Sequence, residues 1–140
     1  MSRLIFVNFP VRDLDKSISF YEAIGARKND MFCDETAACM VLSDVIHVML
    51  ITHDKFRQFT PKNIADAHTV SEVLVCVSAS DKQEVDQLVS KAASAGGKAD
   101  PSAVQDYGFM YGRSFEDLDG HIWEVMWMDM EAAKQAMAKD

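Results

Sequence analysis

The chain of 140 residues is poor in cysteine and has no long apolar run. Its three cysteines, Cys33, Cys39 and Cys76, are odd in number and lack CxxC spacing. This pattern argues against a disulfide framework and against a zinc site made of thiolates. No apolar run approaches the roughly 20 residues of a membrane span, and the first residues lack the apolar segment of a signal peptide. We therefore expect a cytoplasmic protein whose cysteines are small buried hydrophobes.

Basic residues are also scarce relative to acidic ones. The sequence has 14 Lys and Arg against 22 Asp and Glu, which gives a formal net charge of −8. An acidic surface cannot release counterions from nucleic acid or from an anionic membrane, so we expect neither as a partner. Small cationic or metal-bound ligands fit this charge. With 49% hydrophobic and 26% charged residues, the composition is that of one globular domain.

The residue pattern predicts the same succession of elements twice, namely a strand, a helix and three strands. We expect a first module over residues 4–52, a polar linker over 53–70, a second module over 71–128 and a C-terminal helix over 130–139. In the first module the expected strands are 4–11, 27–33, 37–43 and 46–52, and in the second they are 71–78, 98–102, 108–116 and 121–128. Asp13 and Gly25 bound the first helix, and a Ser80 to Gln83 capping box opens the second.

A weak internal repeat supports this duplication. The pair Asp15-Lys16 recurs as Asp81-Lys82, a shift of 81 − 15 = 66 positions. Neither module could bury a sheet face alone, so each must pack on the other or on a second chain. The sequence therefore predicts an α+β fold, and we expect a homodimer.

A lone carboxylate, Glu124, stands in the middle of the last strand. Because side chains alternate between faces, Ile122, Glu124 and Met126 share one face, while Trp123 and its odd-numbered neighbours share the other. Burying an unpaired charge costs several kcal/mol. Two interpretations remain open: Glu124 lies in water on an edge strand, or it is neutralised, hydrogen-bonded or bound to a cation.

Two motifs resemble those of the vicinal oxygen chelate superfamily, which includes glyoxalase I, bleomycin-resistance proteins and extradiol dioxygenases. The first runs from Asn8 to Ser17 and continues with Phe20-Tyr21 and Gly25, and the second runs from Asp117 to Glu124. The resemblance covers nearly the whole chain. It implies two βαβββ modules that form an open eight-stranded cup, commonly completed in a dimer.

In that family, metal ligands project into the cup from the first and last strand of each module. The matching positions here are Phe6, Met49, Glu72 and Glu124. Only the two glutamates can bind a metal, so the resemblance does not extend to strict glyoxalase I activity. His47 shares a strand face with Met49 and is the best candidate for a third ligand of Zn, Ni, Mn or Fe. The alternative for His47 is a hydrogen-bonded or surface histidine.

The resemblance implies that Glu72 and Glu124 face one cavity and carry the chemistry. Two carboxylates about 5 Å apart repel by roughly 3 kcal/mol at an effective dielectric constant near 20. Either one takes up a proton, and becomes a credible general base, or a divalent cation lies between them.

The resemblance implies Phe6 and Met49 as further candidates for substrate binding. Strand alternation adds Asn8, Tyr111 and Arg113. Asn8 could equally make a buried turn contact, and Arg113 could instead be a solvated residue beside Glu116. His53 and His68 lie in the linker and could form a lid or reach a partner chain. His121 points away from Glu124.

Three functions stay open. The first is binding of a small organic molecule in the cup, with proton transfer next to a carbonyl by a glyoxalase-like lyase or isomerase, with or without a metal. The second is a metal-free protein that sequesters a cationic drug, as the bleomycin-resistance members do. The third is extradiol ring cleavage, which needs two histidines and a glutamate on iron, whereas Phe6 stands at the first-strand position.

Overall fold

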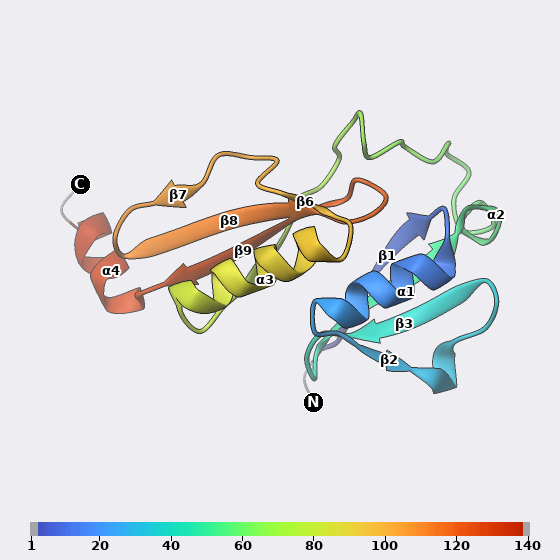
Figure 1. Cartoon of the computed structure of the whole chain (residues 1–140), viewed down its shortest axis with the longest axis horizontal. Helices are drawn as coiled ribbons and strands as arrows, with labels where there is room; N and C mark the ends of the chain where they lie inside the picture. Colours follow the sequence, from blue (N-terminus) through green and yellow to red (C-terminus); the bar gives the residue numbers. More distant parts are fainter. Residues whose placement is uncertain (1–2, 139–140) are drawn as a thin grey trace. The chain divides into compact units, whose positions relative to one another are not determined.

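The computed structural model describes residues 3–138 and contains two β-sheets of matching strand order (Figure 1). The first has the order β1-β4-β3-β2, with β1 (Ile5–Val11), β2 (Arg27–Asn29), β3 (Ala37–Val41) and β4 (Ile46–Thr52). The second has the order β5-β9-β8-β6, with β5 (Val75–Ser78), β6 (Lys98–Ala99), β8 (Met110–Glu116) and β9 (Ile122–Met128). In each sheet the first and last strands of the module pair in parallel. The predicted α+β fold with a duplicated βαβββ module is confirmed.

One strand was not predicted. The short β7 (Gln105–Asp106) pairs with β8, so the sheets hold four and five strands rather than eight in all. It lies in a segment without apolar alternation, and its two residues are exposed. Such a strand carries no sequence signal, because its pairing depends only on the neighbouring backbone.

The first helix, α1 (Leu14–Ala23), begins and ends as predicted. The Asp13 side chain accepts a hydrogen bond from the backbone N–H of Lys16, and Gly25 follows the helix with φ +106°. The buried face contains Leu14, Ser17, Phe20 and Tyr21. Ile18 and Ile24 are only half-buried, since the sheet contacts the helix along a row that passes through Ser17 and Phe20.

The helix of the second module, α3 (Lys82–Ser94), begins one residue later than the predicted capping box implied. Asp81 is the N-cap and accepts from the backbone N–H of Glu84, while Glu84 accepts from the backbone N–H of Ser80. A carboxylate accepts hydrogen bonds more strongly than a hydroxyl, which explains the choice of Asp81 over Ser80. The helix buries Val85, Val89 and Ala92.

Three further boundaries differ from the predicted ones. The strand predicted over 27–33 ends at Asn29, where a 3-10 turn η1 (Asp30–Phe32) starts. The linker opens with α2 (His53–Phe56), and the strand predicted from residue 71 begins only at Val75. The C-terminal helix α4 spans Met130–Ala138, and the predicted last residue, 139, lies outside the described range.

The chain divides into two compact units. The first comprises residues up to Ser71 together with Leu118–His121, the tip of the β8–β9 hairpin, and the second comprises the rest. In the first, α1 packs on β3 and β4; in the second, α3 packs on β8 and β9. Each interface is apolar and buried, with Phe20, Val48 and Leu50 in the first and Val89, Trp123 and Val125 in the second. Between residues 3 and 138, no helix has the length and apolarity that crossing a membrane requires.

Candidate functional site

Glu124 lies in the middle of β9, on the sheet face that α3 does not cover. Its strand neighbours Trp123 and Val125 are buried in the core, at 1% and 0% exposure. Across the sheet, Cys76 of β5 and Ser114 of β8 pair with Glu124. The predicted alternation along this strand is therefore present, and it turns Glu124 away from the core.

The Glu124 carboxylate is half-buried and unpaired. In the described part of the chain it makes no hydrogen bond and no ion pair. Its negative charge acts on Cys76, whose thiol pKa is raised mainly by desolvation and secondarily by Glu124. A carboxylate in this state has free acceptor positions for a ligand.

Glu72, the second predicted carboxylate, lies outside the strands. It is exposed and precedes β5, which starts at Val75. The β5–β9 register brings Cys76, rather than Glu72, beside Glu124. A shared cavity for the two carboxylates stays a prediction.

Four predicted residues of the first module lie on one face of its sheet, opposite α1. Phe6 pairs with His47 and Asn8 pairs with Met49 along the parallel β1–β4 ladder. The rings of Phe6 and His47 stack with centroids 4.6 Å apart. The His47 Nδ1 atom is buried and has no hydrogen-bond partner in the range 3–138. The Asn8 amide is exposed and donates within its own strand to the carbonyl of Phe6 at 3.2 Å, so the buried turn contact considered as its alternative is wrong.

The structure corrects the placement of Tyr111 and Arg113. Arg113 binds Asp100 through Nε and Nη2, at 3.0 and 2.6 Å, and Asp86 of α3 through Nη1 at 2.9 Å. The Tyr111 hydroxyl donates to the same Asp86 at 2.6 Å. Both side chains thus lie on the helix-covered face and not on the Glu124 face. The sequence could not reveal this, because the partner carboxylates are 13 and 27 residues away from Arg113.

This ion pair network shifts several pKa values. The hydrogen bonds from Tyr111 and then Arg113 lower the pKa of Asp86, and the bond to Asp86 raises that of Tyr111. The bidentate bond to Asp100 is the main cause that raises the pKa of Arg113. The backbone of Asp100 has φ +53°, the single positive value for a non-glycine residue within the described range. The network therefore holds the loop after β6 on α3.

The residues predicted to hold a divalent metal do not form a cluster in the described chain. Between residues 3 and 138, no three His, Cys, Asp or Glu side chains come close enough to hold a metal ion. The predicted ligands also come from different units, since Glu72 and Glu124 belong to the second and His47 to the first. A catalytic divalent site needs about three protein ligands. Within the described part of each unit, the predicted ligands therefore do not form a metal site.

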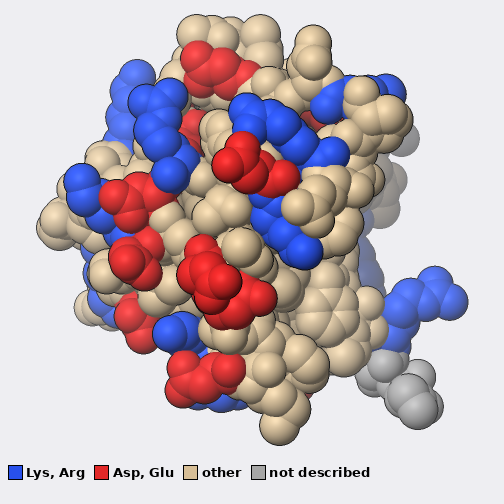
Figure 2. Space-filling view, turned by 90° about the vertical axis from the view of Figure 1, so that its right-hand side faces the viewer, with Lys and Arg blue, Asp and Glu red and all other residues tan. Residues whose placement is uncertain are grey.

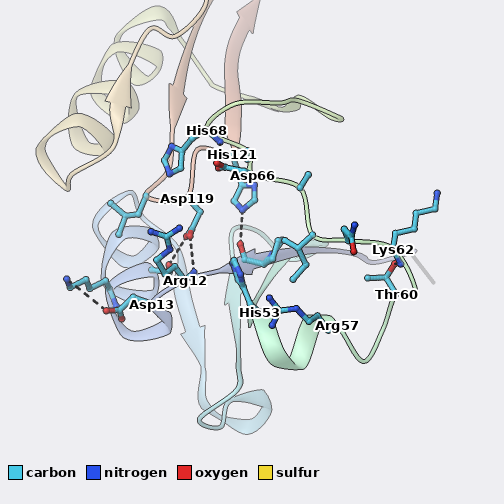
Figure 3. Close-up of a pocket in the computed structure, with 18 of the residues that line it drawn as sticks. Arg12, Asp13, His53, Arg57, Thr60, Lys62, Asp66, His68, Asp119 and His121 are labelled. Carbon is cyan, nitrogen blue, oxygen red and sulfur yellow. Dashed lines mark hydrogen bonds and ion pairs between the residues drawn. The ribbon is translucent and has the colours of Figure 1, made fainter.

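A large cavity lies within the first unit (Figure 3). Its volume is about 1010 Å³, and it is bounded by the end of β1, the start of α1, α2, the linker and the tip of the β8–β9 hairpin. Three of the four histidines of the chain line it, namely His53, His68 and His121. His121, set aside in the sequence analysis, donates from Nε2 to the carbonyl of Pro10 at 2.9 Å and stacks on Phe9 at 4.3 Å.

The hairpin tip is joined tightly to this unit. Asp119 accepts from the backbone N–H of Arg12 at 2.9 Å and from the hydroxyl of Ser17 at 3.4 Å. Gly120 has φ +88°, and a Cβ there would lie 2.6 Å from the backbone nitrogen of His68. Sequence reasoning identified this segment as a turn but missed its role as a wall of the cavity. The glycine after Asp119 was the one available signal, because only glycine permits both this φ and this approach.

Comparison with protein families gives one match. Residues 3–125 match the model described as "Glyoxalase/Bleomycin resistance protein/Dioxygenase superfamily". The search of the curated proteins found no match.

Several solved structures resemble the chain. A hypothetical protein, SA1046, from S. aureus is 28% identical with a TM-score of 0.75, over 91% of this chain and 94% of that one. A glyoxylase/bleomycin resistance protein/dioxygenase domain from Frankia sp. EAN1pec is 25% identical with a TM-score of 0.68, over 92% and 93%. The fosfomycin resistance protein FosX from Mesorhizobium loti is 15% identical with a TM-score of 0.68, over 96% and 98%, and this likeness shows the fold alone.

Proposed function

The chain belongs to the glyoxalase/bleomycin resistance protein/dioxygenase superfamily, and we propose that it binds a small organic molecule against the open face of its second sheet, where Glu124 transfers a proton next to a carbonyl.

The state of the Glu124 carboxylate supports this proposal. It is half-buried in the middle of a strand and has no partner in the described residues. A ligand that donates a hydrogen bond or carries a positive charge could therefore bind this carboxylate. The apolar side chains of Ile122 and Met126 share its face and would contact the body of an organic ligand.

The proposed chemistry is proton transfer by one carboxylate. Glu124 removes a proton from the carbon next to the carbonyl, and the electron pair of the broken C–H bond moves to form an enolate. In an isomerase, the resulting carboxylic acid returns the proton to the adjacent carbon or to oxygen. In a lyase, the enolate re-forms the carbonyl while a new C–C double bond forms, the bond to a group on the neighbouring carbon breaks, and the departing group takes its electron pair and the proton from Glu124. A positioned general base contributes about 10²- to 10⁴-fold to the rate.

The other predicted site residues remain part of this proposal. Phe6, Asn8, His47 and Met49 lie on the corresponding face of the first sheet, which would be a ligand-binding face of its own unit. Glu72 would supply the second carboxylate. A homodimer and a cytoplasmic location also stay predictions.

Hydrogen exchange tests the proposal without knowledge of the substrate. A panel of small ketones, aldehydes and 2-oxo acids is incubated in D₂O, and NMR follows the loss of the proton next to the carbonyl. We expect at least one compound to exchange faster with the protein, and Glu124→Gln to reduce that rate about 100-fold or more.

Glu131→Gln is the matched control, because Glu131 is an exposed carboxylate of α4 in the same unit. It should leave the rate unchanged. Exchange that persists in Glu124→Gln would reject Glu124 as the base.

The same observation also favours a second function, capture of a cationic small molecule without chemistry. An unpaired carboxylate on an open face, in a chain of net charge −8, attracts cations. In that case Glu124→Gln would weaken the binding of cationic ligands, measured by thermal shift, while no compound of the panel would exchange.

A further inference from the structure

The cavity of the first unit has a basic lining that the proposed function does not use. Four basic side chains line it, those of Arg12, Lys16, Arg57 and Lys62. The whole chain has only 14 Lys and Arg residues and a net charge of −8, so basic side chains are enriched at this cavity relative to the rest of the chain. In Figure 3 the side chains of Arg12, His53 and Arg57 surround the same space. Arg12 comes from the β1–α1 junction, His53 from α2 and Arg57 from the C-cap of α2.

The acidic side chains of the same lining are engaged with neighbouring groups. Asp13 accepts from the backbone N–H of Lys16 at 3.1 Å, and Asp66 accepts from that of His68 at 3.0 Å. Asp119 accepts from the backbone N–H of Arg12 and from the Ser17 hydroxyl. Carboxylates that accept such bonds have part of their charge compensated locally, so they oppose an incoming anion less.

The basic groups, in contrast, are available. Within residues 3–138 the Arg12 guanidinium and the Lys62 ammonium make no ion pair. Lys16 and Arg57 pair only with exposed carboxylates of their own helical turn, Asp13 at 4.0 Å and Asp54 at 2.7 Å. Exposed pairs of this kind contribute about 0 to 1 kcal/mol, so a ligand could replace them at small cost.

The wall of the cavity is fixed before a ligand binds. The linker at Ala67 and His68 lies so close to Gly120 that no side chain fits between them. The carbonyl of Asp66 also accepts from the backbone N–H groups of Thr69 and Val70, each at 3.0 Å. A preformed wall reduces the ordering cost of binding.

We propose that this cavity is a second ligand site, which binds a small organic anion through Arg12 and Arg57. Guanidinium groups bind phosphate and carboxylate groups with paired hydrogen bonds. The volume of about 1010 Å³ is far larger than an inorganic ion needs and suits an organic ligand. Pro10, Ile64 and Leu118 provide apolar lining for its body.

The distribution of charge favours a small anion over a polyanion. On the face shown in Figure 2, acidic and basic side chains are interspersed and do not form one broad basic patch. A nucleic acid requires such an extended patch, because it presents a row of phosphates.

Calorimetry with phenyl phosphate and benzoate tests the inference, with phenol as the neutral control. We expect at least one anion to bind and phenol not to bind. The variant with Arg12→Gln and Arg57→Gln should raise the Kd about tenfold or more, because each lost charge-assisted pair weakens binding. The matched variant with Lys91→Gln and Lys134→Gln removes two exposed charges outside the cavity and should change Kd less than about twofold.

NMR titration of the wild-type chain locates the bound probe. Shifts centred on residues 60–68 and 118–121 support the inference, whereas shifts centred on β9 around Glu124 assign the probe to the first proposed site and overturn it. No binding of either anion up to about 10 mM, near the weakest useful affinity, also overturns it. If the double variant does not fold, Arg57→Gln alone is compared with Lys91→Gln. Because the two sites belong to different units, either proposal can fail without the other.

Discussion

The last two strands of each module form a hairpin, and the turns of these two hairpins differ in their burial and in their contacts. The β3–β4 turn at Ser43–Val45 is exposed, and the Ser43 hydroxyl accepts only from the backbone of its own turn. The β8–β9 turn buries Asp117 and Gly120 and binds the β1–α1 junction through Asp119. A repeated topology therefore does not repeat the environment of a turn.

The sheet faces that the helices leave uncovered also carry different side chains in the two modules. The first face has the stacked Phe6 and His47 rings beside Met49, and the second has the unpaired carboxylate of Glu124 beside Cys76. The helix packing also differs, since the second module adds the Arg113 network to its apolar core. The modules thus share a backbone plan, but among residues 3–138 only the second sheet holds an unpaired acidic group, Glu124, in the middle of a strand.

The largest expected effect on stability comes from adding a side chain at Gly120, in the turn between β8 and β9. Gly120→Ala should lower the free energy of unfolding by about 3 kcal/mol, because the new Cβ meets backbone atoms and the φ is unfavourable. Urea denaturation measures the loss. Gly25→Ala, at φ +106° with no atom within 4 Å of its Cβ, should cost only about 1 kcal/mol. Equal losses of unfolding free energy in the two variants would contradict the close approach of the His68 backbone to Gly120.

A smaller effect is expected from the polar network of the second module. Asp86→Asn should lower the free energy of unfolding by at most about 1 kcal/mol at neutral pH, since the Asp86 side chain is 51% exposed. The folded-state pKa of Asp86 is lowered from its usual 3.8, so its charge stabilises the protein above that value. The difference between wild type and variant should vanish as the pH falls through the folded-state pKa.

Denaturation at several pH values measures this difference. The control is Asp54→Asn in the first unit, whose carboxylate is 97% exposed in its pair with Arg57 and should contribute nothing measurable. A loss for Asp86→Asn that persists in acid would contradict the electrostatic cause.

The smallest effect concerns the neighbour of Glu124. Desolvation and then the charge of Glu124 raise the pKa of Cys76, so Glu124→Gln should lower that pKa and speed alkylation by iodoacetamide at pH 8 by about two- to threefold. Mass spectrometry follows the modification at Cys76. Cys39, which is 1% exposed, should stay unreactive in both proteins. An unchanged rate at Cys76 would mean that its thiol does not sense Glu124.

Local signals predicted much of the fold. Asp13 and Gly25 mark the ends of α1 because capping depends on neighbouring residues, and alternation correctly separated Trp123 from Glu124. The shared face of Phe6, Asn8, His47 and Met49 follows from the same period of two.

Other features required the folded chain. The partners of Arg113, the approach of His68 to Gly120 and the bond from His121 to Pro10 join residues that are distant in sequence. No local period encodes such contacts, since they depend on which elements the sheets bring together. The sequence by itself determined the duplicated module and the position of a lone carboxylate on the last strand. The tertiary structure alone decided that this carboxylate is unpaired and that a basic cavity forms beside the hairpin, because both depend on contacts between distant segments.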